Sequence, residues 1–356
     1  MKKEWLKELD YLRGFAILGV IAIHSFVLPP LSLLNYYVGY QDSPIADLTR
    51  QTIIYFTPFA IPLFILISGI ALAYNYYDKI NIFDFYKKRM LRIIPPYVFI
   101  SLISIFSLGL LNQIPSFGTI IFKLLTGTAS DPLWFVAVIL QLYIIFPFIF
   151  IGIIKWQRES SKFFIIFPAI ALLIQFIWVL SRPALSIYFP IHGPGSFLNS
   201  FFLGYFFYFV IGIYFGLYYK ETISLIKSLP ILVPLLIWLG LFLLYYLQEY
   251  SPALGYALEL MFIYSFIILI IRVTLVIIER KSPLGSFICY MGVISFAVYL
   301  ISPFFNYIFW ILLSKSGIDP SNFIYSPLIF LLLVISSVLS IKILMRIPYH
   351  KWLIGV

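Results

Sequence analysis

The sequence predicts an all-α protein, a polytopic membrane helix bundle, and two observations carry this prediction. First, 62% of the 356 residues are hydrophobic, only 11% are charged, and the mean hydropathy is +1.03, whereas a soluble domain is about half apolar and a quarter charged. Second, the apolar residues form long unbroken runs instead of alternating with polar ones, which is typical of spanning helices and not of a membrane β-barrel. We therefore expect a multi-pass integral protein of the cell membrane.

About ten runs of roughly 18 to 26 residues lack interior charges and are long enough to cross a bilayer. They leave no connecting segment in which a second folded domain would fit, so we expect residues 1–356 to form a single integral-membrane domain. In chain order the predicted transmembrane helices lie near residues 11–28, 53–76, 93–111, 133–154, 163–180, 200–219, 230–247, 256–278, 288–313 and 325–345.

Basic residues set the predicted orientation. With the N-terminus in the cytoplasm, 19 of the 24 Lys and Arg residues fall in inner segments or helix ends, four fall in outer segments, and Arg13 lies within the first span. This is the positive-inside pattern, and an even number of spans returns the C-terminus to the cytoplasm. Because anionic lipids of the inner leaflet account for the net charge of +10, we expect membrane lipids as partners and no nucleic acid.

The sequence contains few residues that could form a metal site or a disulfide. The single cysteine, Cys289, cannot form an intramolecular disulfide, and three histidines are too few for an all-His/Cys metal cluster. We expect no metal site and no permanently bound cofactor.

Arg13 and His24 are the most informative polar residues, because both fall within the first predicted span. A charged side chain near the bilayer centre costs about 2.5–3.5 kcal/mol, so ionisable residues there are candidates for function. Eleven residues are about three helical turns, which places both side chains on one face of the helix, roughly 16 Å apart. Taken singly, Arg13 could reach the interface and His24 could be structural. Their shared face favours a functional pair, with a neutral imidazole as general base.

A basic segment precedes the third predicted span. Residues 83–97 read FDFYKKRMLRIIPPY, and Lys88, Arg89 and Arg92 lead into the helix. Arg89 and Arg92 are three residues apart and share a helix face, so they could hold a phosphate group between them. The alternative is an ordinary inner-leaflet cluster that contacts lipid headgroups.

Glu259 is the one carboxylate of the 14 that falls inside a predicted span, about a turn from its outer end. It could support His24 by orienting the imidazole, or it could reach water at the outer surface.

Several segments resemble the acyltransferase 3 family, which comprises integral-membrane O-acyltransferases of the bacterial O-antigen and polysaccharide O-acetyltransferase type. The strongest likeness is in LDYLRGFAILGVIAIH at 9–24 and FYKKRMLRIIPPY at 85–97. The remaining similar segments, at 62–72, 132–147, 206–216 and 294–303, follow in the family's order. The resemblance covers nearly the whole chain.

The resemblance implies acyl transfer from cytoplasmic acyl-CoA, commonly acetyl-CoA, to a hydroxyl of an envelope sugar or lipid-linked glycan. It implies an Arg or Lys followed by an essential His in the first helix, which map onto Arg13 and His24. It also implies a basic pattern at the start of the third helix, which maps onto Arg89 and Arg92. One position departs from the pattern: many members have a late histidine where this chain has Ser302.

These observations lead to a working hypothesis. Acyl-CoA, the donor substrate, docks its phosphates on Arg89, Arg92 and Lys88, and its thioester reaches His24 through the bundle. His24 then acts as general base or carries the acyl group, and Arg13 binds the donor or fixes the helix end.

Two other classes of protein share some of these features. A transporter or exporter of an envelope glycan would also have about ten spans, with His24 and Glu259 lining a path, and would not consume acyl-CoA. A purely structural membrane partner would be indifferent to His24→Ala. The sequence does not name the acceptor, the length of the acyl group or the oligomeric state.

Overall fold

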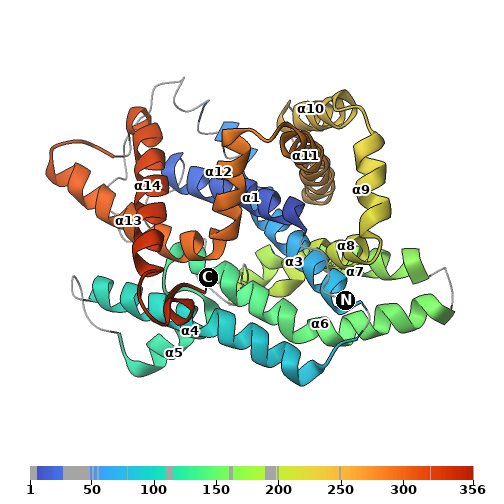
Figure 1. Ribbon diagram of the computed structural model, residues 1–356, viewed down its shortest axis with the longest axis horizontal. Coiled ribbons are helices and arrows are strands. Elements are labelled where there is room, and N and C mark those ends of the chain that lie inside the picture. Colours follow the sequence, from blue (N-terminus) through green and yellow to red (C-terminus); the bar gives the residue numbers. More distant parts are fainter. Residues whose placement is uncertain are drawn as a thin grey trace.

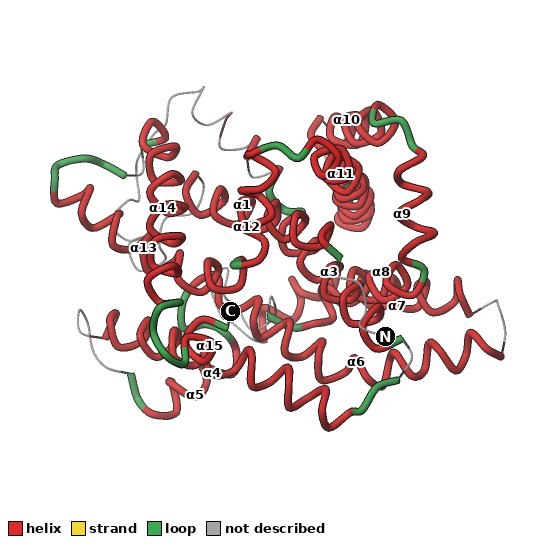
Figure 2. Tube along the Cα trace, viewed as in Figure 1, coloured by secondary structure: helices red, strands yellow, loops and turns green. Residues whose placement is uncertain are grey.

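The computed structural model describes residues 6–26, 49, 52–53, 56–77, 79–109, 115–159, 163–188, 198, 200–247, 250–320 and 322–355. Regular structure in this part of the chain is helical throughout, without strands (Figure 2). The elements are α1 (Lys7–Phe26), α3 (Ala60–Tyr76), α4 (Ile82–Gly109), α5 (Phe117–Thr126), η2 (Asp131–Leu133), α6 (Trp134–Glu159), α7 (Phe163–Tyr188), η3 (Phe202–Tyr205), α8 (Phe206–Leu217), α9 (Tyr219–Ser228), α10 (Leu232–Leu247), α11 (Pro252–Arg280), α12 (Pro283–Val293), α13 (Ser295–Lys315), η4 (Phe323–Tyr325), α14 (Ser326–Leu344) and α15 (His350–Ile354).

The predicted membrane bundle is confirmed. Within the described ranges, seven helices are long and apolar enough to cross a bilayer, namely α1, α4, α6, α7, α11, α13 and α14. An eighth candidate is the pair formed by η3–α8 and α9, which meet at an angle of 95°. The segments predicted at 53–76 and 230–247 contain the shorter apolar helices α3 and α10. Each predicted span therefore contains a helix.

Helix α4 begins at Ile82, so the basic segment before the span predicted near 93–111 is helical, as the shared helix face of Arg89 and Arg92 requires. One predicted span, in contrast, is interrupted. The continuous span predicted at 288–313 is instead α12 followed by α13, with a break at Ile294, whose φ of −95° and ψ of 7° leave the α-helical region. Hydropathy does not register this break because the residues on both sides of it are apolar.

Helix α1 is the centre of the packing (Figure 1). It contacts α3, α11, α12, α13 and α14, and its side chains Leu12, Ala16 and Ile17 are almost completely buried. Gly292 brings α12 against it, because a Cβ at this position would overlap the backbone carbonyl of Asp10. The N-terminal half of α1 and the α12–α13 break are therefore held side by side.

Helices α3 and α8 pack equally closely. A Cβ on Gly212 would overlap the carbonyl oxygen of Leu66, and a Cβ on Gly216 would lie 2.5 Å from the carbonyl oxygen of Ile70. The pair of glycines four residues apart lets the two backbones approach, as in other membrane helix pairs. Gly212 and Gly216 therefore serve the packing of α3 against α8.

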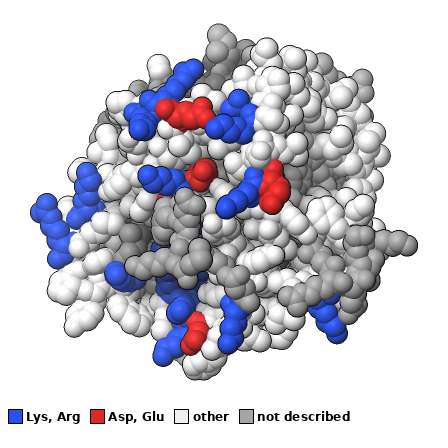
Figure 3. All heavy atoms as spheres, turned by 45° about the vertical axis from the view of Figure 1, so that its right-hand side comes forward, with Lys and Arg blue, Asp and Glu red and all other residues white. Residues whose placement is uncertain are grey.

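The outer surface fits a lipid environment. On α7, Ile165, Leu173 and Ile177 are between 58% and 72% exposed, which in water would be an unfavourable apolar surface. Lys and Arg side chains outnumber Asp and Glu among the described residues on the face seen in Figure 3. The described surface therefore combines exposed apolar side chains with a face whose charges are predominantly positive.

Gly212 gives a direct test of the α3–α8 packing. We expect Gly212→Ala to lower the free energy of unfolding by about 1–3 kcal/mol, because the added methyl group forces the helices apart. Thermal denaturation in detergent measures the effect. Gly240→Ala on α10 is the matched control, because no atom lies within 4 Å of a Cβ there; equal melting temperatures for the two variants would contradict the packing argument.

Candidate functional site

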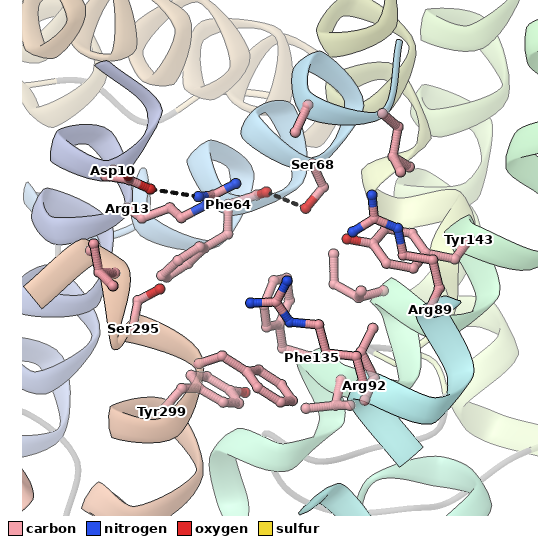
Figure 4. Close-up of a pocket in the computed structure, with 18 of the residues that line it drawn as sticks. Asp10, Arg13, Phe64, Ser68, Arg89, Arg92, Phe135, Tyr143, Ser295 and Tyr299 are labelled. Atoms are coloured by element: carbon pink, nitrogen blue, oxygen red, sulfur yellow. Dashed lines mark hydrogen bonds and ion pairs between the residues drawn. The ribbon is translucent and has the colours of Figure 1, made fainter. Parts of the chain in front are cut away.

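A cavity of about 380 Å³ lies between α1, α3, α4, α6 and the α12–α13 break. Figure 4 shows that its labelled side chains come from all of these helices and point toward one another. The polar and aromatic side chains that line it belong to Asp10, Arg13, Phe64, Ser68, Asn75, Arg89, Arg92, Phe135, Tyr143, Ser295, Phe296 and Tyr299.

Arg13 enters the cavity from α1 and is fixed by Asp10. The guanidinium Nη1 donates a hydrogen bond to Asp10 Oδ1 at 2.8 Å, and the Asp10 side chain is only 4% accessible while that of Arg13 is 30% accessible. The two residues are three apart on one helix, so they share a face. A buried carboxylate needs such a charged partner, and the ion pair holds Arg13 in place.

Arg89 and Arg92 enter from α4. The Arg89 guanidinium carbon lies 5.8 Å from the ring centroid of Tyr143, a cation–π contact. Its Nε is buried and has no hydrogen-bond partner in the described part of the chain. Arg92 donates from Nε to the carbonyl oxygen of Gly355 at 3.2 Å, so one edge of its guanidinium group is held. Both groups face the cavity in Figure 4.

The cavity carries an excess of positive charge. Arg92 is repelled by both Arg89 and Arg13, and Asp10 is the single carboxylate among the described residues that line the cavity. Ser295 places the first turn of α13 at the cavity wall, and the N-terminus of a helix also attracts negative charge. Guanidinium groups bind phosphate oxygens in pairs. The cavity can therefore hold a ligand with several phosphate groups.

His24 lies on the same helix as Arg13 but outside the cavity. It is eleven residues further along α1, about 16 Å. The side chain is half-buried, and its backbone carbonyl oxygen accepts a hydrogen bond from Asn306 Nδ2 on α13 at 3.4 Å. The structure thus separates a charged end of α1 from an end that carries a histidine.

Two other predicted site residues lie elsewhere. Lys88 is exposed and does not line the cavity. Glu259, on α11, lies within electrostatic range of Arg182, Tyr205 and Tyr256, and no hydrogen bond joins it to His24 in the described structure. Arg13, Arg89 and Arg92 are therefore the predicted residues that meet at one cavity.

Asp10, Tyr143 and Ser295 were not predicted as site residues. Asp10 lies just before the first predicted span, and its position three residues before Arg13 was a usable signal. Tyr143 and Ser295 gave no such signal, because their relation to the arginines depends on how the helices pack.

The Asp10–Arg13 pair gives a test of buried charge. Asp10→Asn is expected to lower the free energy of unfolding by about 1–3 kcal/mol, because it leaves Arg13 without its carboxylate. Glu279→Gln removes one partner of the exposed Lys227–Glu279 pair and should leave the melting temperature unchanged. The two variants are compared by thermal denaturation in detergent, and a drop for Glu279→Gln as large as that for Asp10→Asn would refute the buried role of Asp10.

Comparison with known proteins gives one match. The sequence model of an acyltransferase domain, that of the acyltransferase 3 family, matches residues 6–345, nearly the whole chain. No curated protein and no solved structure matches. The match covers α1, the cavity and all spanning helices. The chain therefore belongs to the acyltransferase 3 family and is a membrane acyltransferase.

Proposed function

We propose that this membrane acyltransferase moves an acyl group, most simply acetyl, from cytoplasmic acyl-CoA to a hydroxyl of an envelope sugar or lipid-linked glycan. The observation that carries the proposal is the meeting of Arg13, Arg89 and Arg92 in one cavity. Three guanidinium groups with one carboxylate match a ligand that bears several phosphates. Among common acyl donors, acyl-CoA has this chemistry.

In this proposal the phosphates of the donor bind to Arg89 and Arg92, while Asp10 holds Arg13 toward them. The cation–π contact with Tyr143 and the hydrogen bond to Gly355 restrict the two α4 arginines before the donor arrives. Less side-chain freedom is then lost on binding, so affinity is higher.

His24 acts at the other end of α1. The imidazole takes the proton of the acceptor hydroxyl as its oxygen attacks the carbonyl carbon of the thioester. The new C–O bond forms, the C–S bond breaks, and the CoA thiolate leaves and takes the proton from the imidazolium. In the alternative route the imidazole nitrogen itself attacks the carbonyl carbon of the thioester, the C–S bond breaks, and CoA leaves as the thiol with the imidazole proton, which gives an acyl-imidazole. The acceptor oxygen then attacks this acyl group, the C–N bond breaks, and the hydroxyl proton returns to the imidazole.

The two routes predict different labelling of the protein when the donor is present without acceptor. An acyl-histidine accumulates when labelled acetyl-CoA is mixed with enzyme without acceptor, whereas direct transfer leaves the protein unlabelled.

His24→Ala tests the proposed reaction. Membranes with wild-type protein should transfer label from radiolabelled acetyl-CoA to envelope glycan or lipid-linked sugar, and His24→Ala should reduce the rate by about 10²–10⁴-fold, the contribution of a general base. His350→Ala in α15 is the matched control and should retain activity. Equal transfer by wild type and His24→Ala would remove His24 from the chemistry, and no transfer by folded wild type would favour transport of a glycan.

The arginines are tested separately through the donor. Arg89→Ala and Arg92→Ala should each raise KM for acetyl-CoA by about tenfold or more, since a hydrogen bond to a charged group contributes about 1.5–3 kcal/mol. Neither should change the rate with a short acetyl thioester that lacks phosphates. Lys88→Ala, which alters a neighbouring charge outside the cavity, is the control; a rise in KM as large as that for Arg89→Ala would point to general attraction of anions instead of a defined site.

A further inference from the structure

Helices α1 and α13 run side by side from the cavity to His24. Arg13 and Ser295 both line the cavity, and Asn306 contacts the backbone of His24. Eleven residues separate the two positions in each helix, about 16 Å of rise. The helices are therefore parallel over this length, and we call the line of contact between them the α1–α13 seam.

Three polar side chains share one face of α13. Tyr299, Ser302 and Asn306 lie within about 60° of one another around the helix at 100° per residue. Tyr299 lines the cavity, and Ser302 and Asn306 are only 6% and 5% exposed. Buried polar side chains are retained where they have a partner, so a stripe of them beside the two proposed subsites calls for a ligand or a structural role.

Asn306 has a structural role for one of its two polar atoms. His24 lies two residues before Phe26, the last described residue of α1, and no N–H of the described part of the helix donates to its carbonyl oxygen. Nδ2 of Asn306 supplies that donor at 3.4 Å. The other atom, Oδ1, is buried and accepts no hydrogen bond from the described residues. A buried amide oxygen without a donor is unfavourable, and it marks a place where an N–H group of a ligand would be bound.

The proposed donor has such groups. Between its phosphates and its thioester, acyl-CoA carries a mostly apolar arm with two amides, each with one N–H. If the phosphates bind the arginines and the thioester reaches His24, this arm must cover the distance along which α1 and α13 lie together. Resting on the proposed function, we infer that the α1–α13 seam binds the arm and that Asn306 Oδ1 accepts a hydrogen bond from the amide N–H nearest the thioester.

The competing explanation is that Asn306 only caps α1. Both explanations predict that loss of Asn306 harms the enzyme, so activity with acetyl-CoA alone does not separate them. They differ in one respect: a cap affects every donor alike, whereas a hydrogen bond to the arm matters only for donors that carry the N–H.

Two short thioesters isolate this hydrogen bond. S-Acetyl-N-acetylcysteamine retains the amide nearest the thioester, and its ester analogue has oxygen in place of the N–H. We expect wild-type membranes to show a kcat/KM for the amide about three- to tenfold above that for the ester. Asn306→Leu should bring this ratio to about one while transfer from the ester continues, which also shows that the variant is folded. Ser337→Ala, which alters a buried hydroxyl of α14, is the control and should keep the wild-type ratio.

A second variant separates the two polar atoms of Asn306. Asn306→Asp keeps an acceptor oxygen but has no amide donor for His24, so it should keep a preference for the amide thioester. A ratio of one in this variant, an unchanged ratio in Asn306→Leu, or a wild type without preference would each overturn the inference while leaving the proposed acyltransferase intact. Failure of wild type to use acetyl-CoA and both short thioesters would overturn the proposed function, and this inference with it.

Discussion

The close approach of α12 to α1 is the constraint on which the arrangement of the site depends. Gly292 has no side chain, so the α12 backbone contacts the carbonyl of Asp10. This contact fixes where α12 ends and where α13 starts, and it places Ser295 at the cavity beside Arg13. From that point α13 follows α1 as far as His24 and Asn306. This one backbone contact therefore determines which residues of α13 line the cavity and the direction in which α13 runs beside α1.

Holding three arginines near one another around a cavity is unfavourable unless something offsets the repulsion. Asp10 neutralises one charge, and the ring of Tyr143 and the carbonyl of Gly355 provide weaker contacts for Arg89 and Arg92. Among the described residues that line the cavity, no further carboxylate offsets the remaining positive charge. A site with an excess of positive charge attracts anions. The charge of the cavity, and not its aromatic side chains, is therefore the feature that favours a donor with phosphate groups.

The length of helix α1 sets the distance between Arg13 and His24. A helix rises about 1.5 Å per residue, so the eleven residues between Arg13 and His24 hold the anion-binding end and the histidine end apart. A donor with charge at one end and a reactive group at the other, joined by a long arm, fits this separation. In the proposed reaction the acceptor meets the donor at the far end, where Asn306 donates a hydrogen bond to the backbone carbonyl of His24.

The sequence by itself determined the fold class, the helical nature of every predicted span, and the shared face of Arg13 with His24 and of Arg89 with Arg92. These features depend on hydropathy and helical periodicity, which are local. Only the tertiary structure decided that Arg89 and Arg92 meet Arg13 at the cavity. Lys88 is the neighbour of Arg89 and points about 100° away from it around the helix, and it does not line the cavity. The tertiary structure also decided the α12–α13 break, the burial of Asp10 and the contact of Asn306 with His24. These depend on packing between residues up to 282 positions apart, which local periodicity does not encode.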